Sequence, residues 1–421
     1  MPPEEVVITG VGVVSPIGIG KECYWQQMSA GRSGVGPLRS IDSGTIPVVA
    51  AGEVRDFDAK KFVTPRKNLK VMVRDSELGV AASVLACQDA GLNPGDIDPE
   101  RFGVVLGADR ISGPLSDSEE PHRRCIVDGR FDFSRWATEG MSVAFPLAFL
   151  KVLPNMIASH VSIAHDARGP NNTIHQGDVS GLLAMAEATR LIQRGMAEAV
   201  LAGGASSMLK PYDWVCHCVV GRVSMRQADP ESICRPFDAD RDGEVKGEGA
   251  ALFVLESRRH AEARGASVLA RILGCASSYE IQNGSPRKGE GLRRAIGGAM
   301  REAAVEPRDV GHVNAHGAST ILDDEIEARV IRATLGDVPV TAPKSYFGNL
   351  GAAAGAAEMV ASVMSFQTGL LPVTLNYRHP DPRCAVRVVH GEPWISPTPV
   401  ALVVNMTRAG QAVAIVLSAA E

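Results

Sequence analysis

Near its start the chain reads Val6-Val7-Ile8-Thr9-Gly10-Val11-Gly12-Val13-Val14, an apolar and β-branched run that is too short for a helix. Such a run predicts a strand that is buried on both faces of a sheet. Similar runs recur along the chain, at 103–107, 198–204, 250–255, 268–274, 310–315, 400–405 and 412–418. The chain is therefore expected to build largely buried sheets.

Helical patterns separate these strands. In 77–90 the apolar residues keep to one face and Gly91 supplies a stop, and 179–194 shows the same spacing ahead of Gly195. Further helical stretches are 290–304, 323–335 and 352–367. Strands that alternate with helices predict an α/β fold, with mixed or parallel sheets and helices on their faces.

The two halves of the chain follow the same plan. This predicts two copies of one α/β unit, residues 1–257 and 258–421, in one compact body. From Gly351 to Ala357 the chain contains glycine and alanine alone. Side chains this small let another backbone approach closely, so we expect helix 352–367 to lie between the two sheets.

Composition excludes several classes of protein. The 421 residues are 45% apolar and 22% charged, which argues against disorder and acidic tails. Forty-three basic and 48 acidic residues give a net charge of −5 without long blocks of one sign, which argues against a nucleic-acid partner. The most apolar region, 141–163, is broken by Pro146, Lys151 and Pro154, so no membrane span is expected.

The eight cysteines are scattered and include no Cys-x-x-Cys pair. Cys216 and Cys218 flank His217, but no second ligand pair follows at the spacing of a zinc site, so no metal is expected. Scattered thiols in a chain of this size, together with an N-terminus that lacks a secretory pattern, predict a cytoplasmic protein.

Four segments concentrate polar and glycine residues where chemistry could occur. They are Gly169-Pro-Asn-Asn-Thr-Ile-His-Gln-Gly-Asp-Val-Ser-Gly181, Arg235-Pro-Phe-Asp-Ala-Asp-Arg-Asp-Gly-Glu-Val-Lys-Gly-Glu-Gly-Ala250, Val313-Asn-Ala-His-Gly-Ala-Ser-Thr320 and Lys344-Ser-Tyr-Phe-Gly-Asn-Leu-Gly-Ala-Ala-Ala-Gly355. On its own residues, the segment 235–250 could equally be a polar loop that ion pairs fold onto itself.

Together, and with the opening run 8–18 and the strand 201–205, these segments resemble the β-ketoacyl-acyl carrier protein synthases of the thiolase-like superfamily. These are the condensing enzymes, or ketosynthases, of fatty-acid and polyketide synthesis. The resemblance covers essentially the whole chain. It implies an α/β fold of the thiolase-like kind, a duplicated αβαβα five-layer sandwich that dimerises. It also implies acyl carrier protein as a partner and no cofactor.

The family's chemistry rests on a cysteine at the start of a buried helix and on two histidines. The helix dipole activates the thiol, which holds the acyl chain, and the histidines polarise the malonyl thioester. Aligned on the segments above, the cysteine position is Asp178, the first histidine is His316 and the second is Asn349. The family's Gly-Phe-Gly-Gly turn is replaced within 405–411.

The resemblance also covers the supporting positions. Lys344 and Glu327 match the charged pair that supports the family's site. The two hydroxyl positions that contact the carrier's pantetheine arm are Ala318 and Thr320, so one hydroxyl is kept and one is lost.

These departures decide the expected function. An acyl-aspartate would be a mixed anhydride, which is hard to form from a thioester and quickly hydrolysed. Asp178 has a structural alternative, because aspartate is a good N-cap and would stabilise helix 179–194 by about 1 kcal/mol. His316 is either a buried histidine held by hydrogen bonds or a residue that still holds a thioester carbonyl. Cys216 and Cys218, far away in sequence, are not expected to replace the missing thiol.

The leading hypothesis is a non-condensing partner subunit of an active ketosynthase, similar to the cysteine-less chain-length factors. Those usually carry glutamine at the cysteine position, whereas this chain has Gln176 two residues early. One alternative is residual enzyme activity, either malonyl-acyl carrier protein decarboxylation by His316 and Asn349 or atypical 3-oxoacyl synthesis. Another is a scaffold that binds acyl chains or pantetheine without reaction. The chain is expected to form a homodimer, or a heterodimer with the active ketosynthase.

Overall fold

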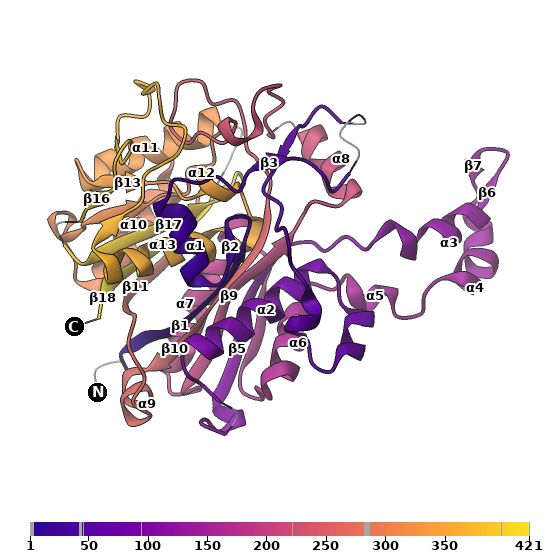
Figure 1. The fold of residues 1–421 in the computed structure, drawn as a ribbon, viewed down its shortest axis with the longest axis horizontal. Helices are drawn as coiled ribbons and strands as arrows, with labels where there is room; N and C mark the ends of the chain where they lie inside the picture. Colours follow the sequence, from indigo (N-terminus) through magenta and orange to yellow (C-terminus); the bar gives the residue numbers. More distant parts are fainter. Residues whose placement is uncertain are drawn as a thin grey trace.

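The computed structural model describes residues 4–41, 44, 46–93, 95–220, 222–281, 287–396 and 398–420. The first half of the chain (indigo to magenta) and the second half (orange to yellow) lie on opposite sides of the molecule (Figure 1). A short antiparallel ladder between β1 (Val6–Ser15) and β11 (Ala270–Tyr279) joins their strands into one large sheet.

The two halves share one strand order. In the first half β1 is followed across the sheet by β10 (Glu248–Ser257), β9 (Ala199–Ser207), β5 (Phe102–Ala108) and β8 (Asn171–Ile174). In the second half β11 is followed by β18 (Gln411–Ala419), β17 (Val400–Met406), β12 (His312–Asn314), β13 (Pro339–Thr341) and β15 (Arg387–Val388). In each half the first two pairings are antiparallel and the next two are parallel. The expected duplication is confirmed.

The predicted helices are confirmed with small shifts at their ends. They are α2 (Arg74–Asp89), α7 (Ser180–Gln193), α10 (Glu290–Ala303), α11 (Ile321–Leu335) and α13 (Ala354–Thr368). All the predicted strands form, but several short strands were not foreseen, among them β8, β13 and β15 toward the two edges of the large sheet. These strands lack the long apolar runs of the central strands.

The helices and sheets stack in five layers, as expected. The central core packs α7 and α13 between the strands of the two halves. A second core packs α2 and α6 (Met156–His165) on the outer face of the first half, and a third packs α10 and α11 on that of the second.

Small residues let α7 and α13 meet. A Cβ atom on Gly181 would lie 2.6 Å from the backbone oxygen of Ala352, and one on Gly355 would lie 2.6 Å from Leu182 Cγ. Every residue from Ala354 to Ser365 is buried. The expected position of α13 is confirmed, between the strands of the two halves, which one ladder joins into a single sheet. A larger side chain at either glycine would force α7 and α13 apart.

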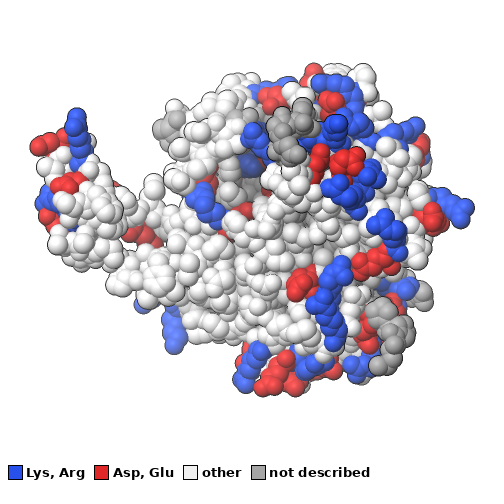
Figure 2. Space-filling view, turned by 180° about the vertical axis from the view of Figure 1, so that it is seen from behind, with Lys and Arg blue, Asp and Glu red and all other residues white. Residues whose placement is uncertain are grey.

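The segment 113–155 leaves the body between β5 and α6 and projects to one side (Figure 1). We call it the arm. It carries α3 (Glu119–Arg124), β6 (Ile126–Val127), β7 (Arg130–Phe131), α4 (Met141–Val143) and α5 (Ala148–Lys151). Several large apolar side chains on it are exposed, among them Leu115, Phe131, Phe133, Met141 and Phe149. In Figure 2 charged side chains gather at its tip, while the surface where it joins the body is mostly uncharged.

The remaining elements are short helices and strands in the connections between the main strands and helices. They include α1 (Lys21–Ser29), α8 (Pro211–Val220), α9 (Arg258–Ala263), α12 (Lys344–Phe347), β2 (Gly18–Ile19), β3 (Gly36–Pro37), β4 (Ala50–Ala51), β14 (Leu370–Leu371) and β16 (Trp394–Ile395). None of the helices in the described ranges has both the length and the apolar character needed to cross a bilayer.

Candidate functional site

Asp178 lies at the entrance to α7 but does not cap it. It belongs to a 3₁₀ turn, Gly177–Val179, which precedes the helix, and no side chain caps either element. The hydroxyl of Ser180 accepts the backbone N–H of Gln176 at 2.8 Å instead. The N-cap interpretation of Asp178 is therefore wrong, because the added turn moves the helix start and the carboxylate points elsewhere.

The carboxylate of Asp178 faces the other two positions singled out in the sequence. Asn349 Nδ2 donates to Asp178 Oδ2 at 3.1 Å, and His316 Nε2 lies 3.9 Å from the same oxygen. The Asp178 side chain is 19% exposed and that of His316 is 4% exposed. The three residues predicted to share a site do lie together, although they are far apart in sequence.

His316 is held in a neutral form directly after β12. Glu327 on α11 accepts the backbone N–H groups of His316 at 2.7 Å and of Gly317 at 2.8 Å. The ring atom Nδ1 contacts Asn405 Oδ1 at 2.9 Å and Lys344 Nζ at 3.1 Å. Burial, and the positive charge of Lys344, hold the pKa of His316 well below its usual range.

Lys344 and Glu327 support His316 from different sides. Lys344 forms its ion pair with Glu358 on α13, and it also donates to the His316 carbonyl at 2.8 Å. Burial raises the pKa of Glu327 to about 8, although the two backbone N–H groups oppose that rise. The ion-pair partner of Lys344 is therefore Glu358, which sequence reasoning missed because its neighbours on α13 are small and apolar.

The two positions matched to pantetheine contacts are buried. Thr320 is the N-cap of α11, where its Oγ1 accepts the backbone N–H of Asp323 at 3.3 Å and donates to that residue's carboxylate at 3.0 Å. Ala318 is 3% exposed. Neither is among the described residues that line the cavity at Asp178.

A cavity of about 400 Å³ opens at Asp178. Its wall combines acidic, basic and apolar side chains: Asp109, Arg110, Asp178, Met208, Cys216, His217, Val220, Arg222, Val223, Glu244, Lys246, Asn349, Thr407, Arg408 and Ala409, with glycines 177, 247 and 351. Of the eight cysteines, all in the described part of the chain, Cys216 on α8 lines this cavity. The fold thus brings it closer to the site than its position in the sequence suggests.

A charged network extends the site toward α11. Glu244 accepts from Asn349 Nδ2 at 3.0 Å and pairs with Lys246 and with Arg222, the latter at 3.4 Å. Arg222 also pairs with Asp323. Burial opposes ionisation of Glu244, but Lys246 and Arg222 together outweigh it and lower the pKa of that carboxyl. The dense charges of 235–250 were the sequence signal for this network.

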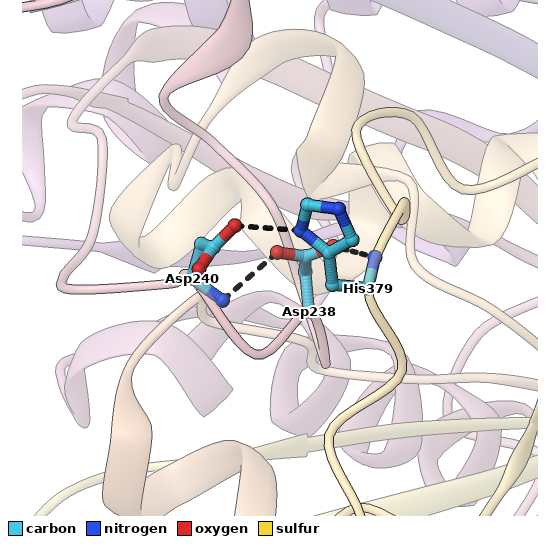
Figure 3. A group of neighbouring side chains, drawn as sticks. All are labelled: Asp238, Asp240 and His379. Atoms are coloured by element: carbon cyan, nitrogen blue, oxygen red, sulfur yellow. Dashed lines mark hydrogen bonds and ion pairs between the residues drawn. The ribbon is translucent and has the colours of Figure 1, made fainter.

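One cluster has the residue types of a metal site. Asp238, Asp240 and His379 place ligand atoms within 4.8 Å of one another (Figure 3). The Asp238 carboxylate already accepts the backbone N–H groups of Asp240 at 2.9 Å and of Arg378 and His379 at 2.7 Å, and Arg235 Nη1 lies 3.5 Å away. These donors occupy both of its oxygens, so the cluster fastens the loop of Asp238 to that of His379.

Comparison with known proteins agrees with this geometry. Two family models match the chain: Beta-ketoacyl synthase, N-terminal domain, over residues 3–261, and Beta-ketoacyl synthase, C-terminal domain, over residues 269–378. The 3-oxoacyl-(acyl-carrier-protein) synthase 2 of Synechocystis sp. is 34% identical over 396 residues, which cover 92% of each chain.

Two solved structures resemble the chain over its full length. The ishigamide ketosynthase/chain length factor has a TM-score of 0.87 and 27% identity, and all of that chain is covered. The second is a type II polyketide acyl-carrier protein in complex with its ketosynthase bound to the hexaketide. It has a TM-score of 0.83 and 29% identity, again with all of that chain covered.

Proposed function

This chain belongs to the beta-ketoacyl synthase family, and we propose that it is a non-condensing partner subunit of an active ketosynthase. The observation that carries the proposal is the carboxylate of Asp178 at the entrance to α7, bonded to Asn349 and facing His316. A carboxylate there cannot store an acyl chain as a thioester. The protein would then shape the acyl tunnel or the carrier docking of its partner.

The bonding of Asn349 argues against malonyl decarboxylation as the function. Its amide has two hydrogens, and these are donated to Asp178 and Glu244. Neither remains for a thioester carbonyl.

The arm and the edge of the sheet support a partner of the same fold. The exposed apolar side chains of the arm would be covered in a dimer. Strand β8 is the edge of the first half's sheet, and a sheet edge can pair with a strand of another chain. The ketosynthase/chain length factor structure is compatible with this arrangement. The boundary between the two halves near residue 257 stays a prediction.

A basic surface supports docking of an acidic carrier protein. Lys60, Lys61, Arg66, Lys67 and Lys70 are all exposed within two short 3₁₀ turns, Ala59–Lys61 and Arg66–Val71. We call them the basic cluster. Clustered charge of one sign steers an oppositely charged partner to the surface. The structurally similar ketosynthase was solved in complex with an acyl-carrier protein.

The test is acyl loading followed by intact-mass measurement. The purified chain, incubated with acyl-acyl carrier protein, should show no covalent adduct. The matched variant Asp178→Cys should gain the mass of the acyl group, because it places a thiol at the start of α7. An adduct on the unmodified chain would contradict the proposal.

A second measurement tests the partner. Co-expression with an intact ketosynthase encoded near this chain should yield a stable 1:1 complex by native mass spectrometry. A homodimer that never exchanges with such a ketosynthase would favour the scaffold alternative instead.

A further inference from the structure

A cavity of about 650 Å³ lies at the base of the arm, apart from Asp178. We call it the arm-base cavity. Its wall comes from Glu248 and from parts of the segments 39–40, 53–55, 72–74, 113–115 and 207–211. Among the described residues, none lines both this cavity and the one at Asp178. Its volume is typical of sites that bind small molecules, which measure roughly 300–1,000 Å³.

One wall separates the two cavities. Met208 lines the cavity at Asp178, whereas its neighbours Ser207 and Leu209 line the arm-base cavity. In the same way, Gly247 lines the first cavity and Glu248 lines the second. The two cavities are therefore adjacent but separate, and a substitution can alter one of them without touching the other.

The two carboxylates in the wall of the arm-base cavity already have partners. Arg74 donates to both oxygens of Glu248, at 2.8 and 3.2 Å, and the Ser207 hydroxyl donates to one of them at 2.7 Å. Glu53 Oε1 accepts the backbone N–H groups of residues 39–40, at 3.0 and 2.6 Å. Both carboxylates therefore hold the segments of the wall together.

Four cationic side chains line the same cavity, and two of them have no acidic partner. Arg74 is paired as described above, and Lys210 pairs with the buried Asp75 at 2.8 Å. Within the described part of the chain, the side chains of Arg39 and Arg55 form no ion pair and donate no hydrogen bond, and both residues are exposed. The cavity therefore presents two guanidinium groups that are available to an anion.

The rest of the wall is largely apolar. Val54, Met72, Val73 and Leu209 are buried, and Leu115, at the base of the arm, is 56% exposed. An apolar chain that lies against these side chains leaves water, as they do, and this is favourable. The arm-base cavity thus combines unpaired positive charge with apolar surface.

We propose that the arm-base cavity binds an amphipathic anion. Arg39 and Arg55 hold its carboxylate or phosphate group, and Leu115 and Leu209 contact its apolar chain. A guanidinium presents its donors in a planar fork that matches two oxygens of either headgroup. A cation would be repelled by these groups, and a neutral chain would leave them without a partner. The proposal does not depend on pairing with a ketosynthase, so either proposal can fail alone.

Isothermal titration calorimetry with decanoate, below the concentration at which it forms micelles, tests the headgroup contacts. The full chain should bind decanoate, and more weakly as the salt concentration rises. Arg39→Gln and Arg55→Gln should each weaken binding about tenfold, because each removes a charge-assisted hydrogen bond. Both residues are exposed, so the variants should fold, which thermal unfolding verifies. The control Arg66→Gln removes an exposed charge outside the cavity and should keep the affinity.

A matched pair of variants locates the apolar chain. Leu115 and Val220 are 56% and 54% exposed, and each lines one of the two cavities. Leu115→Glu should weaken the binding of decanoate, because it places a negative charge in the wall of the arm-base cavity. Val220→Glu makes the same change in the cavity at Asp178 and should leave the affinity unchanged. The opposite ranking would place the anion at Asp178 and overturn the proposal.

Changing the headgroup completes the test. Decanol and decyltrimethylammonium should bind at least about tenfold more weakly than decanoate, because neither can accept charge-assisted hydrogen bonds from the guanidinium groups. Decyl phosphate separates the two sources of the anion: tighter binding than decanoate identifies a phosphate ester, weaker binding identifies a carboxylate, and each result supports the site. Equal affinities for decanoate and decanol would overturn the proposal. So would failure to bind either anion, or an Arg66→Gln variant as weak as Arg55→Gln.

Discussion

Asn349 hydrogen-bonds to Asp178 across the interface between the two halves of the molecule, with Nδ2 and Oδ2 3.1 Å apart. The other hydrogen of the same amide goes to Glu244 at 3.0 Å. Two carboxylates are thereby held close to one neutral side chain. The ketosynthase pattern has a histidine at position 349. A neutral histidine side chain has a single N–H and could donate to only one of the two carboxylates. The two departures from the ketosynthase pattern, Asp178 and Asn349, therefore fit each other.

Replacing Asn349 by histidine should destabilise the protein. One carboxylate would lose its donor, and leaving such a group unsatisfied costs about 1–3 kcal/mol. The free energy of unfolding in urea measures this loss. In the Asp178→Cys background the loss should shrink, because one of the two carboxylates is gone. Equal losses in both backgrounds would show that the two positions are not coupled.

Lys344→Met should be strongly destabilising. It leaves Glu358, which is fully buried, without its ion-pair partner, and breaking a buried pair in this way costs roughly 3–5 kcal/mol. Thermal unfolding is the measurement. The double variant Lys344→Met, Glu358→Gln should recover part of the loss because it removes the unpaired charge. If the double variant is less stable than the single one, the ion pair is not the cause.

Acid stability should depend on Glu256 at the end of β10. Burial opposes ionisation of this carboxyl, but hydrogen bonds from Arg264, His260 and Thr9 outweigh it and lower its pKa to about 2. A lowered carboxyl pKa stabilises the folded state above the ordinary value of 4.5, and that contribution is lost as the pH falls from there toward 2.

Glu256→Gln should therefore be less stable than the parent at pH 7, and the difference should narrow below pH 4.5. Chemical denaturation at a series of pH values tests this expectation. The variant Glu262→Gln, at an exposed carboxylate on the neighbouring α9, serves as the control and should show little change at either pH. If the stability difference between the parent and Glu256→Gln does not vary with pH, the ionisation of Glu256 does not contribute to acid stability.

Two glycine-to-alanine substitutions should change the stability of the protein in opposite directions. Gly181→Ala places a methyl group 2.6 Å from the Ala352 carbonyl oxygen, and overpacking of this kind costs about 1–3 kcal/mol. At Gly297 on α10 the nearest atom is the flexible end of Arg301, 3.4 Å away, so alanine should stabilise the helix by about 0.5–1 kcal/mol. Thermal unfolding compares them. A neutral Gly181→Ala would show that α7 and α13 can separate without cost.

The affinity of the basic cluster for an acyl carrier protein should fall as the salt concentration rises. Reversing the charge of Lys67 and Lys70 to glutamate should slow association with an acyl carrier protein, because the rate of encounter depends on complementary charge. Surface plasmon resonance at low and high salt measures both effects. Charge reversal at Arg168, an exposed arginine that follows α6 in the sequence, is the control. If it slows association equally, the basic cluster is not the docking surface.

The sequence by itself determined the duplicated α/β architecture. Each buried position needs an apolar or small side chain. The pattern of apolar residues therefore predicts which positions are buried, both in strands such as 6–14 and in helices with one apolar face such as 77–90. The glycine and alanine run of 351–357 placed α13 between the sheets for the same reason. Resemblance to the ketosynthases also assigned Asp178, His316 and Asn349 to one site.

Tertiary structure alone decided what those residues contact. Glu358 and Asn405 are isolated polar residues in apolar elements, and nothing local shows that they meet Lys344 and His316. Asp178 looked like a helix cap because capping depends on the few residues around it, whereas its true partners come from the loop after β12 and the turn before α13. Side-chain direction at a junction between two halves depends on contacts made over long separations, which a local pattern does not encode.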